Sequence, residues 1–122
     1  MLFRSVRAIY VGGAKVANLI TLENPGVTPQ AGYIYTVMGG GPSTAYTAGT
    51  SVAASNMTLG GLRKIAMDSR GDLFVIDNTS DVVWFEDAST GYIRDIAGLY
   101  NVTYTANPSS PDRKSTRLNP VT

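Results

Sequence analysis

The sequence predicts an all-β fold made of antiparallel, four-stranded meanders. The strongest indication is the stretch 62–98, where three turn-forming clusters, DSRGD, DNTS and EDASTG, separate the four short apolar runs KIAM, DLFVI, DVVWF and YIRDIAG. Runs of this length that are rich in β-branched and aromatic residues, and bounded by Gly, Asp, Asn and Ser, are typical of strands. Four such strands in one continuous stretch predict a single meander sheet.

The second observation is that two of these runs do not alternate between apolar and polar residues. The runs LFVI and VVWF are apolar throughout, so both faces of their strands should be covered. Radially stacked sheets meet this condition, because each sheet packs against a neighbour on either side. The pattern therefore predicts part of a β-propeller, with a two-sheet sandwich as the main competitor.

An internal repeat is the third observation. AGYIYTVMGG at 31–40 matches TGYIRDIAGL at 90–99 in Gly-Tyr-Ile and in a later glycine, and AIYV at 8–11 resembles DLFVI at 72–76. Repeats with a period of a few tens of residues are a signature of propellers and other repeat architectures. The repeat predicts that the chain spans about two blades.

The first of these blades is expected to be partial, with residues 1–40 supplying its last three strands. The outer two of these strands are placed at 5–12 and 33–38, and a turn-rich connector occupies 24–31. The blade has no counterpart of the first strand of 62–98.

The segment between them, AKVANLITLE at 14–23, is ambiguous. Val16, Leu19 and Ile20 have helical spacing, and Ala, Leu and Lys favour a helix. The short flanking link and the internal repeat favour a strand, and a strand is the prediction.

The remaining segments are assigned from the same division of the chain into two blades. Residues 41–61 are rich in small and polar residues and are predicted to form a surface loop between the blades. Residues 62–98 form the complete blade, and 99–111 begin the next linker. Each Asp-containing turn of that blade has a structural explanation, because an Asp carboxylate accepts a backbone N–H two residues on and a following Gly closes the hairpin.

The tail 112–122, DRKSTRLNPVT, has a different composition and resembles the translation of a sequencing adaptor. The alternative is an ordinary solvated basic tail. In either case it is excluded from the fold prediction. Leaving out its three basic residues and one aspartate reduces the ten basic and nine acidic residues of the chain to seven and eight. The basic balance of the whole chain is therefore no indication of a partner.

The motif I-A-x-D-S-x-G-D-L-F-V-x-D, followed by V-V-W-F and T-G-Y-I-x-x-I-A-G, resembles the NHL-repeat family of β-propellers. It is carried by Ile65, Ala66, Asp68, Ser69, Gly71, Asp72, Leu73, Phe74, Val75, Asp77, Val82, Val83, Thr90, Gly91, Tyr92, Ile93, Ile96, Ala97 and Gly98. The resemblance implies a closed ring of blades in a bacterial-type, secreted or periplasmic parent protein, with binding loops on one rim. It also implies that 39–61 and 77–81 lie together on that rim.

Residue types exclude the commonest catalytic sites from this chain. It has no His and no Cys, so it lacks the base of a serine or cysteine triad and the usual ligands of zinc. Gly39–Pro42 lacks the Lys and the following helix of a phosphate-binding loop. Four scattered basic residues, Arg63, Lys64, Arg70 and Arg94, form no cluster of the kind that nucleic-acid binding requires.

Acidic and aromatic side chains are the remaining candidates. The acidic set is Asp68, Asp72, Asp77, Asp81, Glu86, Asp87 and Asp95. These residues could supply calcium ligands or an acid/base pair, but turn capping is the favoured interpretation, because every Asp except Asp95 flanks a turn. The aromatic set is Tyr33, Tyr35, Tyr46, Trp84, Tyr92, Tyr100 and Tyr104. Those inside strands are interpreted as core residues in preference to stacking surfaces for sugars or bases.

These observations predict a non-catalytic ligand- or protein-binding scaffold with no catalytic, cofactor-binding or metal-binding residue of its own. Its expected partner is a protein, peptide or carbohydrate; nucleic acid is not expected, and no apolar run is long enough to span a membrane. We expect the fragment to self-associate through open strand edges. The alternatives are a fragment of a propeller lyase or hydrolase whose catalytic residues lie in other blades, and a purely structural repeat module.

Overall fold

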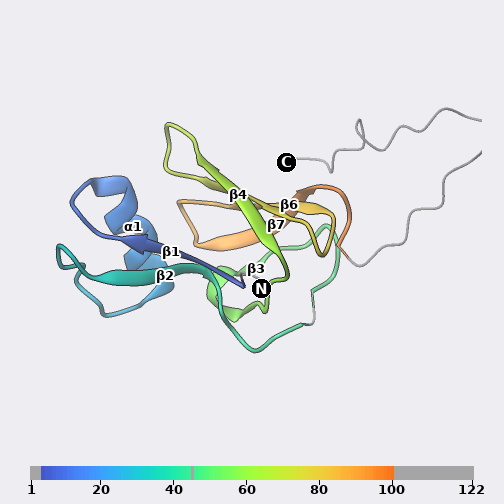
Figure 1. Cartoon of the computed structure of the whole chain (residues 1–122), viewed down its shortest axis with the longest axis horizontal. Coiled ribbons are helices and arrows are strands. Elements are labelled where there is room, and N and C mark those ends of the chain that lie inside the picture. The colour runs from blue at the N-terminus through green and yellow to red at the C-terminus, as the bar shows by residue number, and fades with distance from the viewer. Residues whose placement is uncertain (1–3, 45, 101–122) are drawn as a thin grey trace, which may run out of the picture.

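The computed structural model describes residues 4–44 and 46–100, and it contains two antiparallel sheets and one α-helix (Figure 1). This arrangement confirms the all-β prediction. The elements in chain order are β1 Ser5–Ile9, α1 Ala14–Glu23, β2 Ile34–Gly39, β3 Val52–Ala53, the 3-10 turn η1 Ala54–Asn56, β4 Leu62–Met67, β5 Leu73–Asp77, β6 Val82–Glu86 and β7 Tyr92–Ala97. The predictions for 112–122 and for most of 99–111 lie outside the described residues.

The predicted four-stranded meander of 62–98 is confirmed. Strands β4 to β7 pair with their sequence neighbours in antiparallel order, and β3 adds a fifth strand beside β7. The turns form as predicted, since Gly71 N–H donates to the Asp68 carbonyl and Gly91 N–H to the Asp87 carbonyl. Both glycines have a positive φ, 91° and 75°, which a residue with a side chain rarely adopts.

The strand predicted at 14–23 is wrong, because this segment is helix α1. The helix buries Leu19, Ile20 and Glu23, which share one face at helical spacing and would point to different sides of a strand. Strands β1 and β2 pair directly with each other, so the sheet has no gap for a middle strand. The N-terminal unit therefore has two strands and a helix where three strands were expected.

The surface loop predicted at 41–61 is also wrong in part. Tyr46, Ala54, Met57 and Leu59 of this segment are buried in the core, although small and polar residues surround them in the sequence. Gly41 allows the backbone of η1 to approach closely, because a Cβ at Gly41 would collide with main-chain atoms of that turn. The segment thus connects the two sheets as part of the packed interior.

One expectation about this segment is confirmed at its end. The Gly61 N–H donates to the Thr79 hydroxyl over 2.7 Å, and the Asn78 N–H donates to the Gly61 carbonyl over 2.8 Å. The end of the linker and the β5–β6 turn therefore lie side by side, as the resemblance implied for 39–61 and 77–81.

The five-stranded sheet has two unlike faces. Paired residues of neighbouring strands lie on the same side of a sheet, so the register places Val75, Trp84 and Asp95 on one face. We call this the covered face, because its apolar side chains join those of β1, β2, α1 and the linker in one core. In Figure 1, β1, β2 and α1 lie together to the left of the β4–β7 sheet.

The opposite side we call the open face, and it is formed by Phe74, Ile76, Val83, Phe85, Tyr92 and Arg94. No element of the described chain covers it completely, since Ile76 is 42% exposed and Tyr92 48% exposed. Neither α1, which has ten residues, nor the single turn of η1 could span a bilayer, and these are the helices of the described segments.

Candidate functional site

The acidic residues singled out in the sequence do not converge on one site. Asp68 accepts the backbone N–H groups of Arg70 and Asp72, each over 2.9 Å. Asp87 accepts the Ser89 N–H over 2.8 Å and the Ser89 hydroxyl over 2.6 Å. The Ser89 hydroxyl and N–H hold the pKa of the Asp87 carboxyl below its ordinary value. For these two residues the turn-capping prediction is confirmed.

Two further carboxylates hold loops to the sheet. Asp72 accepts the Ala88 N–H over 2.8 Å, which ties the β6–β7 turn to the end of the β4–β5 turn. Its other oxygen lies 3.5 Å from the Arg70 guanidinium. Asp81 sits in the β5–β6 turn with a φ of 55°, a conformation that Asp tolerates better than most residues.

Asp95 is buried within strand β7 and anchors the linker. It accepts hydrogen bonds from the Tyr46 hydroxyl over 2.9 Å, from Gly49 N–H over 3.0 Å and from Tyr100 N–H over 2.8 Å. Burial raises the pKa of Tyr46 to about 12, with the nearby Asp95 carboxylate as a lesser cause. Asp95 flanks no turn in the sequence, and the structure shows that its partners lie outside strand β7.

The aromatic residues divide between the core and the surface. Trp84 packs edge-on against Tyr46 and tilted against Tyr100, with centroid distances of 5.0 and 5.3 Å. This confirms the prediction that Trp84 belongs to the core. Tyr33 is 61% exposed, whereas Tyr104 lies beyond the residues that the structure describes.

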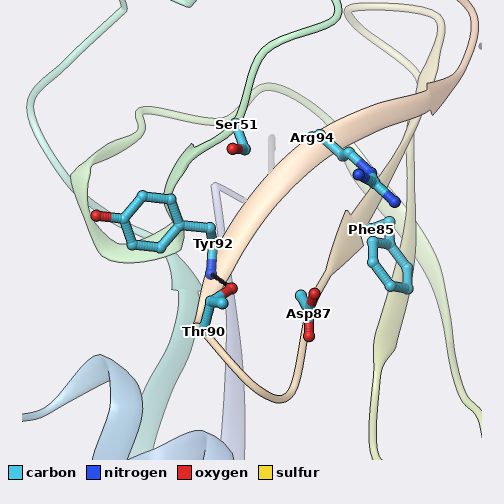
Figure 2. Close-up of a pocket in the computed structure, with 6 residues that line it drawn as sticks. All are labelled: Ser51, Phe85, Asp87, Thr90, Tyr92 and Arg94. Carbon is cyan, nitrogen blue, oxygen red and sulfur yellow. Dashed lines mark hydrogen bonds between the residues drawn. The ribbon is translucent and has the colours of Figure 1, made fainter. Parts of the chain in front are cut away.

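A pocket opens on the surface beside the β6–β7 turn (Figure 2). Its volume is about 240 Å³, and its lining consists of Ser51, Phe85, Asp87, Thr90, Tyr92 and Arg94. The Arg94 guanidinium lies 5.3 Å from the centre of the Phe85 ring, a cation–π contact. In Figure 2 the Tyr92 ring points away from Phe85 and Arg94, so the two aromatic rings do not face each other across the pocket.

The size of this pocket limits what it can hold. Sites for small molecules usually enclose roughly 300–1,000 Å³. The pocket is smaller than that and lies at the border of the open face, with which it shares Phe85, Tyr92 and Arg94. It is therefore part of the border of the open face and smaller than an ordinary small-molecule site.

The least expected feature is a pair of buried carboxyl groups, Glu23 at the end of α1 and Glu86 at the end of β6. Glu23 is 8% exposed and Glu86 0% exposed, and each carboxyl group shifts the pKa of the other. The Ser55 N–H donates to Glu23 Oε1 over 3.0 Å. Within the described chain, Glu23 Oε2 and both Glu86 oxygens are buried and have no donor.

The chemistry of this pair follows from its burial. Two ionised carboxylates can only accept hydrogen bonds, so a bond between them requires a proton on one of the two. Burial raises the pKa of Glu86 well above its usual range, and the neighbouring Glu23 raises it further. Burial also raises the pKa of Glu23, less strongly because Glu86 and Ser55 donate to it. Burial without donors therefore favours the protonated form of the pair, and one proton between the two carboxyl groups is enough for a hydrogen bond between them.

The sequence does indicate that Glu86 lies on the covered face. It lies two residues after Trp84, so in a strand both side chains point to the same, covered face. Its partner Glu23 could not be inferred, because the segment around it was predicted as a strand. In the part of the chain that the structure describes, no three His, Cys, Asp or Glu side chains gather as metal ligands would.

Comparison of the chain with protein-family models, with curated proteins and with solved structures finds no match. The structure by itself defines the class: an antiparallel meander sheet with one covered face, one open apolar face and carboxylates engaged in internal hydrogen bonds.

Proposed function

We propose that this chain is a non-catalytic, protein-binding scaffold: a section of an NHL-type β-propeller whose open face packs against a further sheet of the same kind. For the chain by itself, that further sheet is a second copy. The observation that carries the proposal is the apolar character of the open face.

The open face has the composition of an interface. Phe74 and Phe85 lie side by side on it with ring centroids 5.1 Å apart, and Ile76 is paired across the strands with Val83. Its charged member, Arg94, rests over the Phe85 ring. Contiguous apolar side chains of this kind on a protein surface mark an interaction site.

The occupant is inferred from what covers the other face of the same sheet. There the side chains of Leu73, Val75, Trp84 and Ile93 are buried in one hydrophobic cluster with residues of β1, β2, α1 and the linker. A sheet that is apolar on both sides and covered by a β-layer on one side is best completed by a β-layer on the other. Stacking thus continues in the same direction, as it does between propeller blades.

The outer strand β4 adds a second open element. Its Ile65 is 60% exposed and its Met67 41% exposed, and in the described structure its outer edge pairs with no strand. Unpaired edges promote association between chains. The edge supports the expectation of self-association, whereas the open face gives the association its specific geometry.

Most carboxylates of the described chain accept hydrogen bonds from its own donors or are buried, and this supports a role without catalysis. A substrate cannot reach the sealed Glu23–Glu86 pair, and Asp68, Asp77, Asp87 and Asp95 are engaged by donors of their own chain. A propeller enzyme would need its catalytic groups from residues outside this chain. No described residue favours that alternative.

Sedimentation velocity over a concentration series tests the proposal. The wild-type chain should self-associate, and Ile76→Lys should weaken the association because it places a charge on the open face. Val11→Lys is the matched control, since Val11 is 82% exposed and lies away from that face. A monomer at every concentration, or equal association of the two variants, would overturn the proposal.

A further inference from the structure

We infer that Glu23 and Glu86 form a proton-dependent latch that fastens the C-terminal turn of helix α1 to the five-stranded sheet. The latch is closed while the two carboxyl groups share one proton and opens when that proton is lost. It concerns the joint between the two layers of the chain and does not depend on the proposed function.

The position of the pair makes it a joint. Glu23 is the last residue of α1 and Glu86 the last residue of β6, so the contact links the N-terminal unit to the meander. Gly91 lies directly over it: a Cβ at Gly91 would come within 2.5 Å of Glu23 Oε2. The turn thus closes the site to solvent and leaves room for the two carboxyl groups alone.

Few other contacts hold this end of the helix to the sheet. Asn18 donates its side-chain N–H to the Ala88 carbonyl over 2.7 Å, and Leu19 and Ile20 are buried in the core. The Asn24 side chain donates to the Thr36 carbonyl of β2 over 2.9 Å and so holds α1 to its own unit. Opening of the latch would therefore loosen the last turn of α1 while the apolar contacts keep the helix in place.

Among the described residues, no cationic group neutralises the pair. Within the described segments, the groups that act on Glu86 are its own burial and Glu23, and those on Glu23 are its burial, Glu86 and Ser55. Lys15 lies at the opposite end of α1, where its aliphatic part contacts Gly71. Arg94 lies on the open face over Phe85, on the other side of the sheet from Glu86.

The remaining acidic groups nearby are already engaged. Asp72 is held by the Ala88 N–H and by Arg70, and Asp87 by Ser89. The 3-10 turn η1 presents the Ser55 N–H and the Ser55 side chain to Glu23. Among the described residues no third His, Cys, Asp or Glu joins the pair as a metal ligand would, which favours a proton as the neutralising species.

The direction of the pH effect follows from the raised pKa of both groups. The unfolded chain loses these protons near the ordinary pKa of glutamate, about 4.3, whereas the folded chain retains the shared proton to higher pH. The stabilisation is therefore complete at acidic pH and falls as the pH rises toward the folded-state pKa. Once the proton is lost, two buried negative charges repel each other, and the last turn of α1 loosens from the sheet.

Hydrogen exchange of the full chain, measured by mass spectrometry in buffers containing EDTA, tests the latch. The protection factors of amides 17–24 should fall as the pH rises from about 6 to 9, by up to about tenfold per pH unit for one linked proton. The protection of β5 and β6 should change less. In Glu86→Gln the amide donates permanently to Glu23, so the protection of α1 should lose its pH dependence; Glu23→Gln should have the same effect.

Asp81→Asn is the matched control, because it removes an exposed carboxylate from a turn and should leave the wild-type slope unchanged. Three results would overturn the inference: protection of α1 independent of pH in the wild-type chain, an unchanged slope in both Gln variants, or equal loss of slope in Asp81→Asn. If one Gln variant does not fold, the other and the wild-type profile decide.

Discussion

Asp77 accepts a hydrogen bond from the indole Nε1 of Trp84 over 3.1 Å, and both side chains are almost completely buried. The same carboxylate accepts the N–H groups of Gly60, Thr79 and Ser80. One side chain thus joins β6, the β5–β6 turn and the end of the linker, and its two oxygens accept hydrogen bonds from four donors.

Asp77→Asn should destabilise the fold by about 3 kcal/mol, because an amide group cannot accept from all four donors and hydrogen bonds to a charged group are worth about 1.5–3 kcal/mol each. Urea unfolding followed by the fluorescence of Trp84, the single tryptophan, measures the change. Asp81→Asn in the neighbouring turn is the control and should stay within about 0.5 kcal/mol of wild type. Equal effects of the two substitutions would contradict the role given to Asp77.

Tyr46→Phe tests the anchor of the linker. The Tyr46 hydroxyl lies 2.9 Å from the Asp95 carboxylate and 2.5 Å from the Thr50 carbonyl, and its removal leaves Asp95 with one donor fewer. We expect a loss of about 2 kcal/mol in the free energy of unfolding. Tyr33→Phe, at a residue that is 61% exposed, should be nearly neutral. A neutral Tyr46→Phe would show that the linker is held by ring packing alone.

The Asp87 carboxyl provides a prediction for acidic pH. Its folded-state pKa lies below the unfolded value, so its stabilisation is present above the unfolded pKa, about 3.9, and is lost as the pH falls through the folded one. Ser89→Ala removes the hydroxyl donor and should raise the pKa of Asp87, measured by NMR titration of the side-chain carboxyl. Thr90→Ala, one residue further on, should leave that pKa unchanged. A pKa of Asp87 that does not respond to Ser89→Ala would refute the assignment.

Gly91→Ala should be markedly more destabilising than an ordinary glycine substitution. Gly91 has a φ of 75°, and an added Cβ would meet both Glu23 Oε2 and the Leu22 side chain. Gly26 is the control, because its φ of 83° is similar but nothing lies within 4 Å of its Cβ position. We expect a loss of about 1 kcal/mol at Gly26, from backbone strain alone, and of more than about 2 kcal/mol at Gly91, measured by urea unfolding. Similar losses at both sites would mean that α1 is not packed against the turn.

Local features made the meander predictable from sequence. The apolar runs of 62–98 are short and are separated by Asp- and Gly-containing turns, so each strand and each turn carries its own signal. The roles of Asp68 and Asp87 follow from the same local chemistry, because their carboxylates accept hydrogen bonds from N–H groups only a few residues away.

Features that depend on distant contacts were not predictable. The helix at α1 was predicted as a strand because the repeat outweighed the spacing of Leu19 and Ile20, which proved decisive. Tyr46 and Met57 belong to the core through contacts with the sheet, and their polar neighbours in sequence concealed this. The Glu23–Glu86 pair likewise exists only after α1 has docked, so no local pattern could indicate it.

The central claim, that the open face packs against a second sheet of the same kind, is tested most directly by cross-linking between copies. The chain contains no cysteine, so Ile76→Cys introduces a single reactive thiol on the open face. With a short bis-maleimide, Ile76→Cys should form covalent dimers in high yield, whereas Val11→Cys, which is more exposed but lies away from that face, should remain monomeric. Equal dimer yields from the two variants would contradict the claim.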